Sequence, residues 1–312
     1  EIYTLSLHDA LPICVSNMSL KFEKDKVYQM PVFFGPGSMQ CDPGNGDRPA
    51  KNMNSHFQPG EVQVVQVTYE TEREVLEKMI PECYTLNDPY VSVCLCEFTN
   101  LGWLAGKTYN LININVPVHF KGDRDDLDGD LVLVMFENHA DPIVGGRDTM
   151  GYSKIYCDIP RVQHDENKYI ATASSWDFRF MKMELDISKP IPDMETFKSN
   201  EARSAGKMHY KYVPDVMEKG EDPATNFTKP AIAYPTILPK WQRPDDYPYN
   251  LRIPDIDFCD GKVEFYKPEW TDMPTYYNVG VGLNSLVCKR VIGAKHLIYD
   301  EPCEYTTCYK LR

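Results

Sequence analysis

The chain has little of what marks helical membrane proteins or nucleic-acid-binding proteins. No window approaches the roughly 18 consecutive apolar residues that a membrane helix needs. Lys and Arg number 33 against 46 Asp and Glu, which gives a formal net charge of -13. No block of basic residues provides the positive surface of a nucleic-acid binder. The sequence therefore predicts a soluble protein that binds neither nucleic acid nor membrane.

Several common catalytic motifs are also missing from the sequence. It has no phosphate-binding P-loop, no dinucleotide-binding fingerprint, no GxSxG nucleophile elbow and no HExxH zinc motif. The seven histidines form no cluster typical of a zinc site. We therefore expect no nucleotide cofactor and no metal.

The cysteines and the N-terminal residues both bear on the cellular compartment of the protein. Ten cysteines are present without a CxxC pair, and residues 1–17 have neither the basic start nor the apolar run of a secretory signal. Reduced thiols and a cytoplasmic location are expected. Residues 1–17 resemble a translated leader ahead of Met18, and we treat them as non-native.

Four segments alternate apolar and polar residues in the manner of half-buried strands. They are residues 62–70, 90–100, 109–120 and 131–138. A short helix is expected over 71–81, with Thr71 and Glu74 as a capping box. Strands dominate and no strand–helix alternation appears, which predicts a mainly antiparallel β architecture, barrel-like, in a single domain over 18–312.

The second half of the chain continues this pattern. Strands are expected within 168–186, 261–270 and 279–302, and a helix around 194–206. Residues 214–260 are rich in proline and aspartate and are expected to form an irregular excursion.

The segment KGDRDDLDGD, residues 121–130, has part of the spacing of a calcium-binding loop. Aligned on Gly129, however, the first ligand position is Arg124 and the twelfth is Met135, neither of which suits calcium. The segment is better explained as an acidic hairpin turn that ends in Asp-Gly.

The stretch GGRDTMGYSKIYCDIP (145–160) places a lysine in an expected strand just after a glycine-rich turn. In a strand, Tyr152, Lys154 and Tyr156 would share one face. The lysine could then lie in an aromatic-lined pocket as a nucleophile, or it could face solvent at the edge of a sheet. The local pattern leaves both alternatives open.

The order of motifs resembles the acetoacetate decarboxylase superfamily. The matching segments are VTYETEREVLEKMIPE (67–82), NVPVHFKGD (115–123), ADPIVGGRDTMGYSK (140–154), KYIATASSWDF (168–178) and, more loosely, YKPEWTDMPT (266–275). This resemblance implies a cone-shaped antiparallel β-barrel that has a few short peripheral helices. It also implies that Lys154 is a Schiff-base nucleophile that needs no cofactor, and that the protein is a homo-oligomer.

The resemblance further implies a set of site residues, in which this chain departs from the family. Arg147 and Tyr152 accompany Lys154 as catalytic candidates. The second lysine of the family motif is Ile155 here, its glutamate is Leu111, and its substrate-side arginine is Val62. Candidate substrate-binding residues are Tyr156, Leu111, Val62, Asn115 and Glu97.

A neutral lysine amine can condense with a ketone to an iminium, which accepts the electrons released when a neighbouring C–C bond breaks. The leading hypothesis is a Schiff-base carbon–carbon lyase that acts on a β-keto or related oxo acid. A second hypothesis keeps the same imine but assigns aldol, dehydration or cyclisation chemistry. A third is a non-catalytic β-barrel that binds an apolar small molecule.

Overall fold

The computed structural model describes residues 22–24, 28–35, 60–220, 222, 229–240, 242, 250–301 and 308–312. Contacts divide the chain into two units, residues 1–53 and 54–312. In the first unit a short 3-10 turn, η2 (Val32–Phe34), is described. The expected leader lies outside the described residues, and the second unit carries the strands and the lysine motif.

The second unit is mainly β, as the sequence predicted. Its strands are β1 (Gly60–Glu70), β2 (Tyr84–Leu86), β3 (Tyr90–Leu101), β4 (Lys107–Lys121), β5 (Asp126–Glu137), β6 (Lys154–Tyr156), β7 (Gln163–Asp165), β8 (Lys168–Ser175), β9 (Phe178–Asp186), β10 (Gly206–Pro214), β11 (Pro230–Pro239), β12 (Ile256–Phe265), β13 (Arg290–Glu301) and β14 (Tyr309–Lys310). Short helical segments join them: α1 (Arg73–Glu77), η3 (Gly102–Leu104), α2 (Ala140–Gly145), η4 (Gly146–Met150), α3 (Met194–Arg203) and α5 (Tyr277–Asn284).

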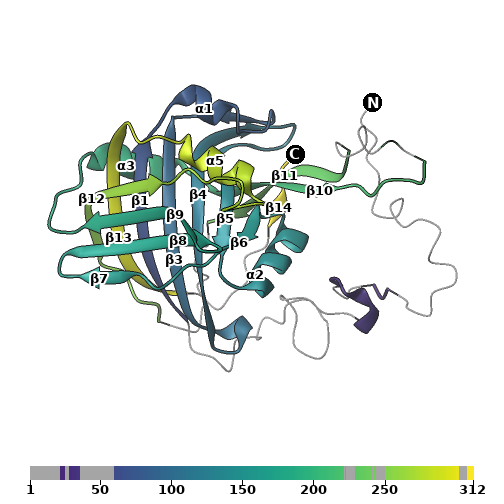
Figure 1. The fold of residues 1–312 in the computed structure, drawn as a ribbon, viewed down its shortest axis with the longest axis horizontal. Helices are drawn as coiled ribbons and strands as arrows, with labels where there is room; N and C mark the ends of the chain where they lie inside the picture. The colour runs from purple at the N-terminus through teal and green to yellow at the C-terminus, as the bar shows by residue number, and fades with distance from the viewer. Residues whose placement is uncertain are drawn as a thin grey trace. The chain divides into compact units, whose positions relative to one another are not determined.

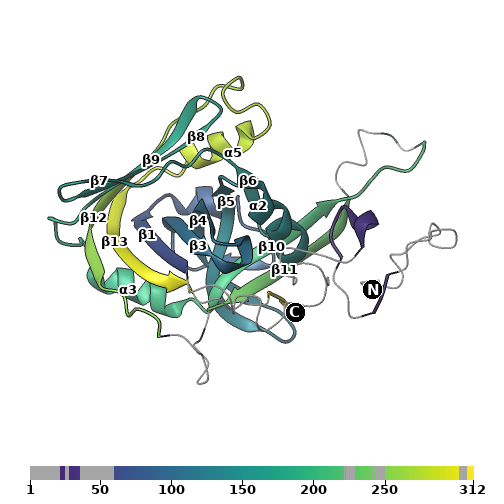
Figure 2. The same ribbon diagram turned by 90° about the horizontal axis from the view of Figure 1, so that it is seen from below.

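The strands of the described residues form one continuous sheet in the order β14-β11-β10-β5-β4-β3-β1-β13-β12-β9-β8-β7 (Figure 1). Strand β2 pairs with β4, and β6 pairs with β5. Neighbours are antiparallel except that β10 and β6 each run parallel to β5. The two end strands, β14 and β7, do not pair with each other. Figure 2 shows that the sheet is strongly curved. The barrel that the sequence predicted is not confirmed as closed, because the two end strands do not pair.

Most sequence-predicted elements are confirmed, and the exceptions have physical reasons. The capping box is wrong: α1 begins after Glu72 with no side-chain cap, and the hydroxyl of Thr71 is buried without a partner. The turn after β4 closes at Gly122–Asp125, so the acidic residues that follow already belong to β5. Tertiary packing decided both positions, because neither local motif is strong enough to override it.

Two expectations for the second half need correction. The segment VGVGLN, expected as strand, lies in helix α5, whose Leu283 is buried in the core. The excursion at 214–260 is not wholly irregular, because β11 lies within it and pairs along β10. Prolines are tolerated in β11 because its other side pairs with β14 at only two positions, Thr236 and Ile237.

Strand β12 joins two layers of the sheet. Its first half pairs with β13 and its second half pairs with β9, and the change occurs between Cys259 and Asp260. Gly261 at this bend allows close packing, since a Cβ there would lie 2.8 Å from both Ala294 Cβ and Val67 Cγ2. The bend folds β9 and β8 back over β1, and the main hydrophobic core lies between these layers.

Strands β1, β3, β4 and β5 therefore have two distinct faces. The register places Val65, Leu95, Ile112 and Phe136 side by side on the face that we call the core face. Phe136 packs there against Phe180 of β9, with ring centroids 4.8 Å apart. Each such fully buried side chain contributes about 1.5–3 kcal/mol.

The opposite face of these strands, which we call the lysine face, is buried but partly polar. One row across it consists of Val64, Cys96, Leu111 and Glu137. Glu137 is fully buried, and Leu111 is 7 % exposed. A buried carboxylate in such a row must have a charged or hydrogen-bonding partner.

Candidate active site

Lys154 supplies that partner. It begins the short strand β6, which lies parallel to β5 and places Lys154 beside Met135. Its side chain is only 4 % exposed, and its Nζ lies 2.8 Å from Oε1 of Glu137. Nζ also donates a hydrogen bond of 3.0 Å to the main-chain carbonyl of Pro142 in α2. The solvent-facing alternative for Lys154 is therefore excluded.

The glycine-rich turn makes room for this side chain. A Cβ on Gly146 would lie 2.6 Å from Cε and 2.7 Å from Nζ of Lys154. Gly146 begins η4, a single π-helical turn that follows directly from α2. Such turns often mark functional sites. Here the glycine is needed because any larger residue would occupy the space that the lysine fills.

The two charged groups perturb each other's proton affinity. Burial lowers the pKa of the Lys154 ammonium, and the carboxylate of Glu137 only partly opposes that shift. Burial likewise raises the pKa of Glu137, and Lys154 only partly opposes it. Both shifts favour the uncharged forms, an amine and a carboxylic acid, because neither charge is well solvated in this position. An amine of this kind can attack a carbonyl carbon.

Arg147 has a structural position. Its guanidinium donates a 2.8 Å hydrogen bond to the main-chain carbonyl of Lys154, while its side chain is exposed. Arg147 therefore holds the backbone of β6. This geometry does not support a direct role for the Arg147 guanidinium in chemistry at Nζ of Lys154.

Tyr152 lies before strand β6, so the predicted face of three residues is only partly formed, and the two tyrosines differ in burial. Tyr152 is buried, and Lys154 Nζ lies 5.0 Å from its ring centroid. Tyr156 is 53 % exposed, and its hydroxyl donates to Asp158. Within β6 the alternation holds: Lys154 and Tyr156 lie beside Met135 and Glu137 on the lysine face, and Ile155 lies in the core beside Phe136.

The remaining candidates divide between the two faces. Val62, Leu111 and Asn115 lie on the lysine face, and all three are buried. Glu97 lies on the core face, because it pairs with Asn110 while its neighbour Cys96 pairs with Leu111. Its carboxylate accepts a 2.7 Å hydrogen bond from the amide of Val162. Glu97 is thus separated from Lys154 by the sheet itself.

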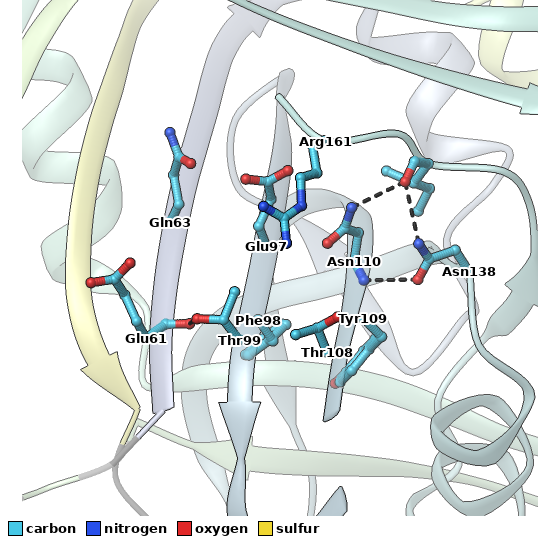
Figure 3. Close-up of a pocket in the computed structure, with 11 residues that line it drawn as sticks. Glu61, Gln63, Glu97, Phe98, Thr99, Thr108, Tyr109, Asn110, Asn138 and Arg161 are labelled. Carbon is cyan, nitrogen blue, oxygen red and sulfur yellow. Dashed lines mark hydrogen bonds between the residues drawn. The ribbon is translucent and has the colours of Figure 1, made fainter. Parts of the chain in front are cut away.

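Glu97 instead lines a pocket of about 330 Å³ at the end of the core face (Figure 3). Asn110 and Asn138 in this pocket both donate to the carbonyl of Ile159, at 3.0 and 3.2 Å. Neither Glu137 nor Pro142, the two groups within hydrogen-bond distance of Lys154 Nζ, lines it. The pocket is therefore separate from the lysine.

Sequence reasoning missed three residues of the lysine site. Glu137 had a signal, since it is the single charge in the apolar run LVLVMFEN. Gly146 belongs to the motif already selected but was not assigned a spatial role. His209 had no signal. It lies on β10 and stacks on Tyr152 with ring centroids 3.9 Å apart.

The described residues contain no group of three or more His, Cys, Asp or Glu side chains that could hold a metal ion. None of the helices in the described ranges is long and apolar enough to cross a membrane.

The fold and the site together define a mainly β protein in which a buried lysine is paired with a buried carboxyl group. The model of the family "Acetoacetate decarboxylase (ADC)" matches residues 29–244. The chain belongs to the acetoacetate decarboxylase family.

Individual relatives are distant. Acetoacetate decarboxylase 3 of Mesorhizobium japonicum is 28 % identical over 125 residues, which are 38 % of this chain and 46 % of that protein. The match therefore spans less than half of the curated relative.

Solved structures agree in fold over most of the chain. The acetoacetate decarboxylase of Legionella pneumophila superimposes with a TM-score of 0.56 at 17 % identity, covering 81 % of this chain and 88 % of that one. The enduracididine biosynthesis enzyme MppR complexed with pyruvate has a TM-score of 0.54 at 11 % identity, covering 85 % and 94 %. An acetoacetate decarboxylase-like enzyme from Sphingomonas wittichii has a TM-score of 0.52 at 13 % identity, covering 77 % and 88 %.

Proposed function

We propose that this protein is a Schiff-base-forming carbon–carbon lyase that acts on a β-keto or related oxo acid. The observation that carries the proposal is the buried pair of Lys154 and Glu137, in which both pKa shifts favour the neutral amine and the carboxylic acid. Membership of a family named for a decarboxylase supports the same chemistry.

The proposed reaction begins when the neutral amine of Lys154 attacks the ketone carbon. The hydroxyl group of the addition product takes up a proton from solvent and leaves as water, which gives an iminium. The bond to the neighbouring carboxylate then breaks, CO2 leaves, and its electron pair forms an enamine. The carboxylic acid of Glu137 delivers a proton to the enamine carbon, which gives a second iminium. Water hydrolyses this iminium to the product ketone and the amine of Lys154, and the proton released returns to the carboxylate of Glu137. Positioned proton transfer of this type contributes about 10²–10⁴-fold to a rate.

The surroundings of the pair suit a substrate with an apolar part. Leu111 lies directly opposite Glu137 on the lysine face, and Val62 is fully buried on the same face. The resemblance implied a glutamate at the first of these positions and an arginine at the second. The carboxyl group is therefore supplied from β5 instead of β4, whereas Val62 offers no cation for a carboxylate.

A second candidate keeps the imine and replaces decarboxylation by aldol, dehydration or cyclisation chemistry. The absence of a cation at Val62 favours it, because a carboxylate is then not held for loss as CO2. The fold is also shared with MppR, which has been captured with the condensation product of pyruvate and imidazole 4-carboxaldehyde. Product analysis distinguishes the two candidates.

The proposal includes two further expectations, a homo-oligomer and closure of the curved sheet into the cone-shaped barrel of the family. Size-exclusion chromatography with light scattering tests the first, and an experimental structure tests the second.

Borohydride trapping tests the imine directly. The protein is incubated with a panel of β-keto and 2,4-dioxo acids, reduced, and analysed by peptide mass spectrometry over residues 148–161. We expect a substrate-dependent adduct on Lys154 that is absent in Lys154→Ala and retained in Lys168→Ala, which removes an exposed strand lysine. No adduct with any acid in the folded wild-type protein would contradict the proposal and favour a binding protein.

A further inference from the structure

The lysine face contains buried polar atoms that no protein group satisfies. Among the described residues, six buried side-chain atoms lack a hydrogen-bond partner: Thr71 Oγ1, Asn115 Oδ1, both oxygens of Glu137 and both ring nitrogens of His209. Oε1 of Glu137 lies 2.8 Å from Nζ of Lys154. The carbonyl oxygen of Asn115 and the two ring nitrogens of His209 have no such partner among the described residues. Buried polar atoms are nearly always hydrogen-bonded in folded proteins, so these two residues require an explanation.

His209 lies near Lys154, and Asn115 lies on the same face of the sheet, on strand β4. His209 is 1 % exposed and follows Met208, which pairs with Leu131 of β5. Its ring stacks on Tyr152, whose ring lies 5.0 Å from Lys154 Nζ.

Asn115 is connected to Ser153, the residue before Lys154, through Val132 of β5. It is 1 % exposed and lies on β4 opposite Val132 of β5. The carbonyl of Val132 accepts a 3.1 Å hydrogen bond from Ser153, the residue before Lys154. The amide group of Asn115 donates to Asn113 of the same face, which leaves its carbonyl oxygen unpartnered.

The charge state of His209 limits what it can bind. Burial, together with the positive charges of Lys154 and Lys207, lowers its pKa well below the usual value. Its ring stacks on Tyr152, its neighbour across the ladder is Thr236 of β11, and the lysines that influence its pKa are Lys154 and Lys207. The ring is therefore neutral near pH 7 and offers one N–H donor and one lone pair. Such a ring suits an uncharged oxygen better than a carboxylate, which would require a cation.

We propose that His209 and Asn115 bind a second, uncharged oxygen of the substrate while Lys154 holds its ketone carbon as an imine. The substrate class is then an oxo acid with a further carbonyl or hydroxyl group on its carbon chain, a dioxo acid or a hydroxy-oxo acid. This inference rests on the proposed Lys154 imine. It makes His209 the residue that determines specificity.

A matched pair of acids tests the inference, 3-oxohexanoate and 5-hydroxy-3-oxohexanoate. We expect the wild-type protein to prefer the hydroxylated acid in kcat/KM, because a site built to bind an oxygen discriminates against the analogue that lacks it. His209→Phe keeps the ring stacked on Tyr152 but removes both nitrogens. It should reduce the preference by tenfold or more, which corresponds to about 1.4 kcal/mol. His209→Gln restores a donor and an acceptor and should recover part of it.

The outcomes separate the two proposals. If His209→Phe lowers kcat/KM equally for both acids, or leaves the preference unchanged in a protein that melts like wild type, the specificity role is wrong. If borohydride traps neither acid on Lys154, the imine fails. The affinity of each acid, measured by calorimetry in wild type and His209→Phe, then decides the recognition role without any chemistry. A preference for the hydroxylated acid that depends on His209 supports it, and equal affinities overturn it.

Discussion

Exchanging Leu111 and Glu137 is the sharpest test of the proposed proton donor. The two residues are direct antiparallel neighbours on β4 and β5, so their Cβ atoms lie about 4.5–5.5 Å apart on the same face. A glutamate at either position can direct its carboxyl group toward Lys154. The double variant Leu111→Glu/Glu137→Leu also places the carboxyl group where the family resemblance implied it.

The single variant Glu137→Leu should lose most activity. It removes the carboxyl group 2.8 Å from Lys154 Nζ in a position with almost no solvent exposure. Loss of a positioned proton donor lowers kcat by about 10²–10⁴-fold. Removing one partner of a buried ion pair costs about 3–5 kcal/mol if the other stays charged. Lys154 can avoid part of this cost by losing its proton, so the loss of stability should be smaller at high pH.

The double variant should recover at least tenfold of the lost kcat, because it restores the carboxyl group while keeping the total volume of the pair. The assays are kcat for the best acid of the panel, borohydride trapping on Lys154, and urea unfolding at pH 6 and pH 9. Glu97→Gln is the matched control. It removes a strand carboxylate whose pKa is also raised by burial, but on the core face, and it should leave kcat within a few-fold of wild type.

Two results would refute this reasoning. Wild-type kcat in Glu137→Leu would show that Glu137 transfers no essential proton. A double variant that is stably folded yet no more active than Glu137→Leu would show that a carboxyl group on this face is not sufficient.

Further predictions concern Gly146 in the turn, Arg147, the exposed Tyr156 and the half-buried carboxyl group of Glu301. Gly146→Ala should abolish trapping on Lys154 without unfolding the protein, because its Cβ would lie 2.6 Å from the lysine Cε; trapping at the wild-type rate would contradict this. Arg147→Ala should lower stability by about 1 kcal/mol, measured by urea unfolding, through loss of one hydrogen bond to the backbone. An effect on kcat as large as that of Glu137→Leu would instead indicate a direct role for Arg147. Tyr156→Phe should leave kcat/KM unchanged within a few-fold, since its hydroxyl faces Asp158; a tenfold loss would restore it as a site residue. Burial raises the pKa of Glu301 to about 7, so the folded state binds more protons than the unfolded state between about pH 4.5 and 7, and stability falls as pH rises through this window. Glu301→Gln should remove part of that fall, about 1.4 kcal/mol per pH unit, and an unchanged pH profile of urea unfolding would contradict the assignment.

Local sequence patterns were sufficient to predict most of the strands. β1, β3, β4 and β5 each span many residues in which apolar residues of the core face alternate with residues of the partly polar lysine face. The motif around Lys154 was recognisable because its residues are contiguous in the chain. The capping box and the strand expected over VGVGLN failed because short signals of this kind are decided by what the rest of the chain packs against them.

The sequence by itself thus determined that the protein is mainly β, that it belongs with the acetoacetate decarboxylases, and that Lys154 is the residue to examine. Only the tertiary structure decided which groups surround that lysine. Glu137 becomes its partner through the parallel pairing of β5 with β6, and His209 through the parallel pairing of β10 with β5. Glu97 is excluded because alternate residues of one strand lie on opposite faces. Register and pairing depend on contacts between residues far apart in the chain, and no local pattern in the sequence specifies them.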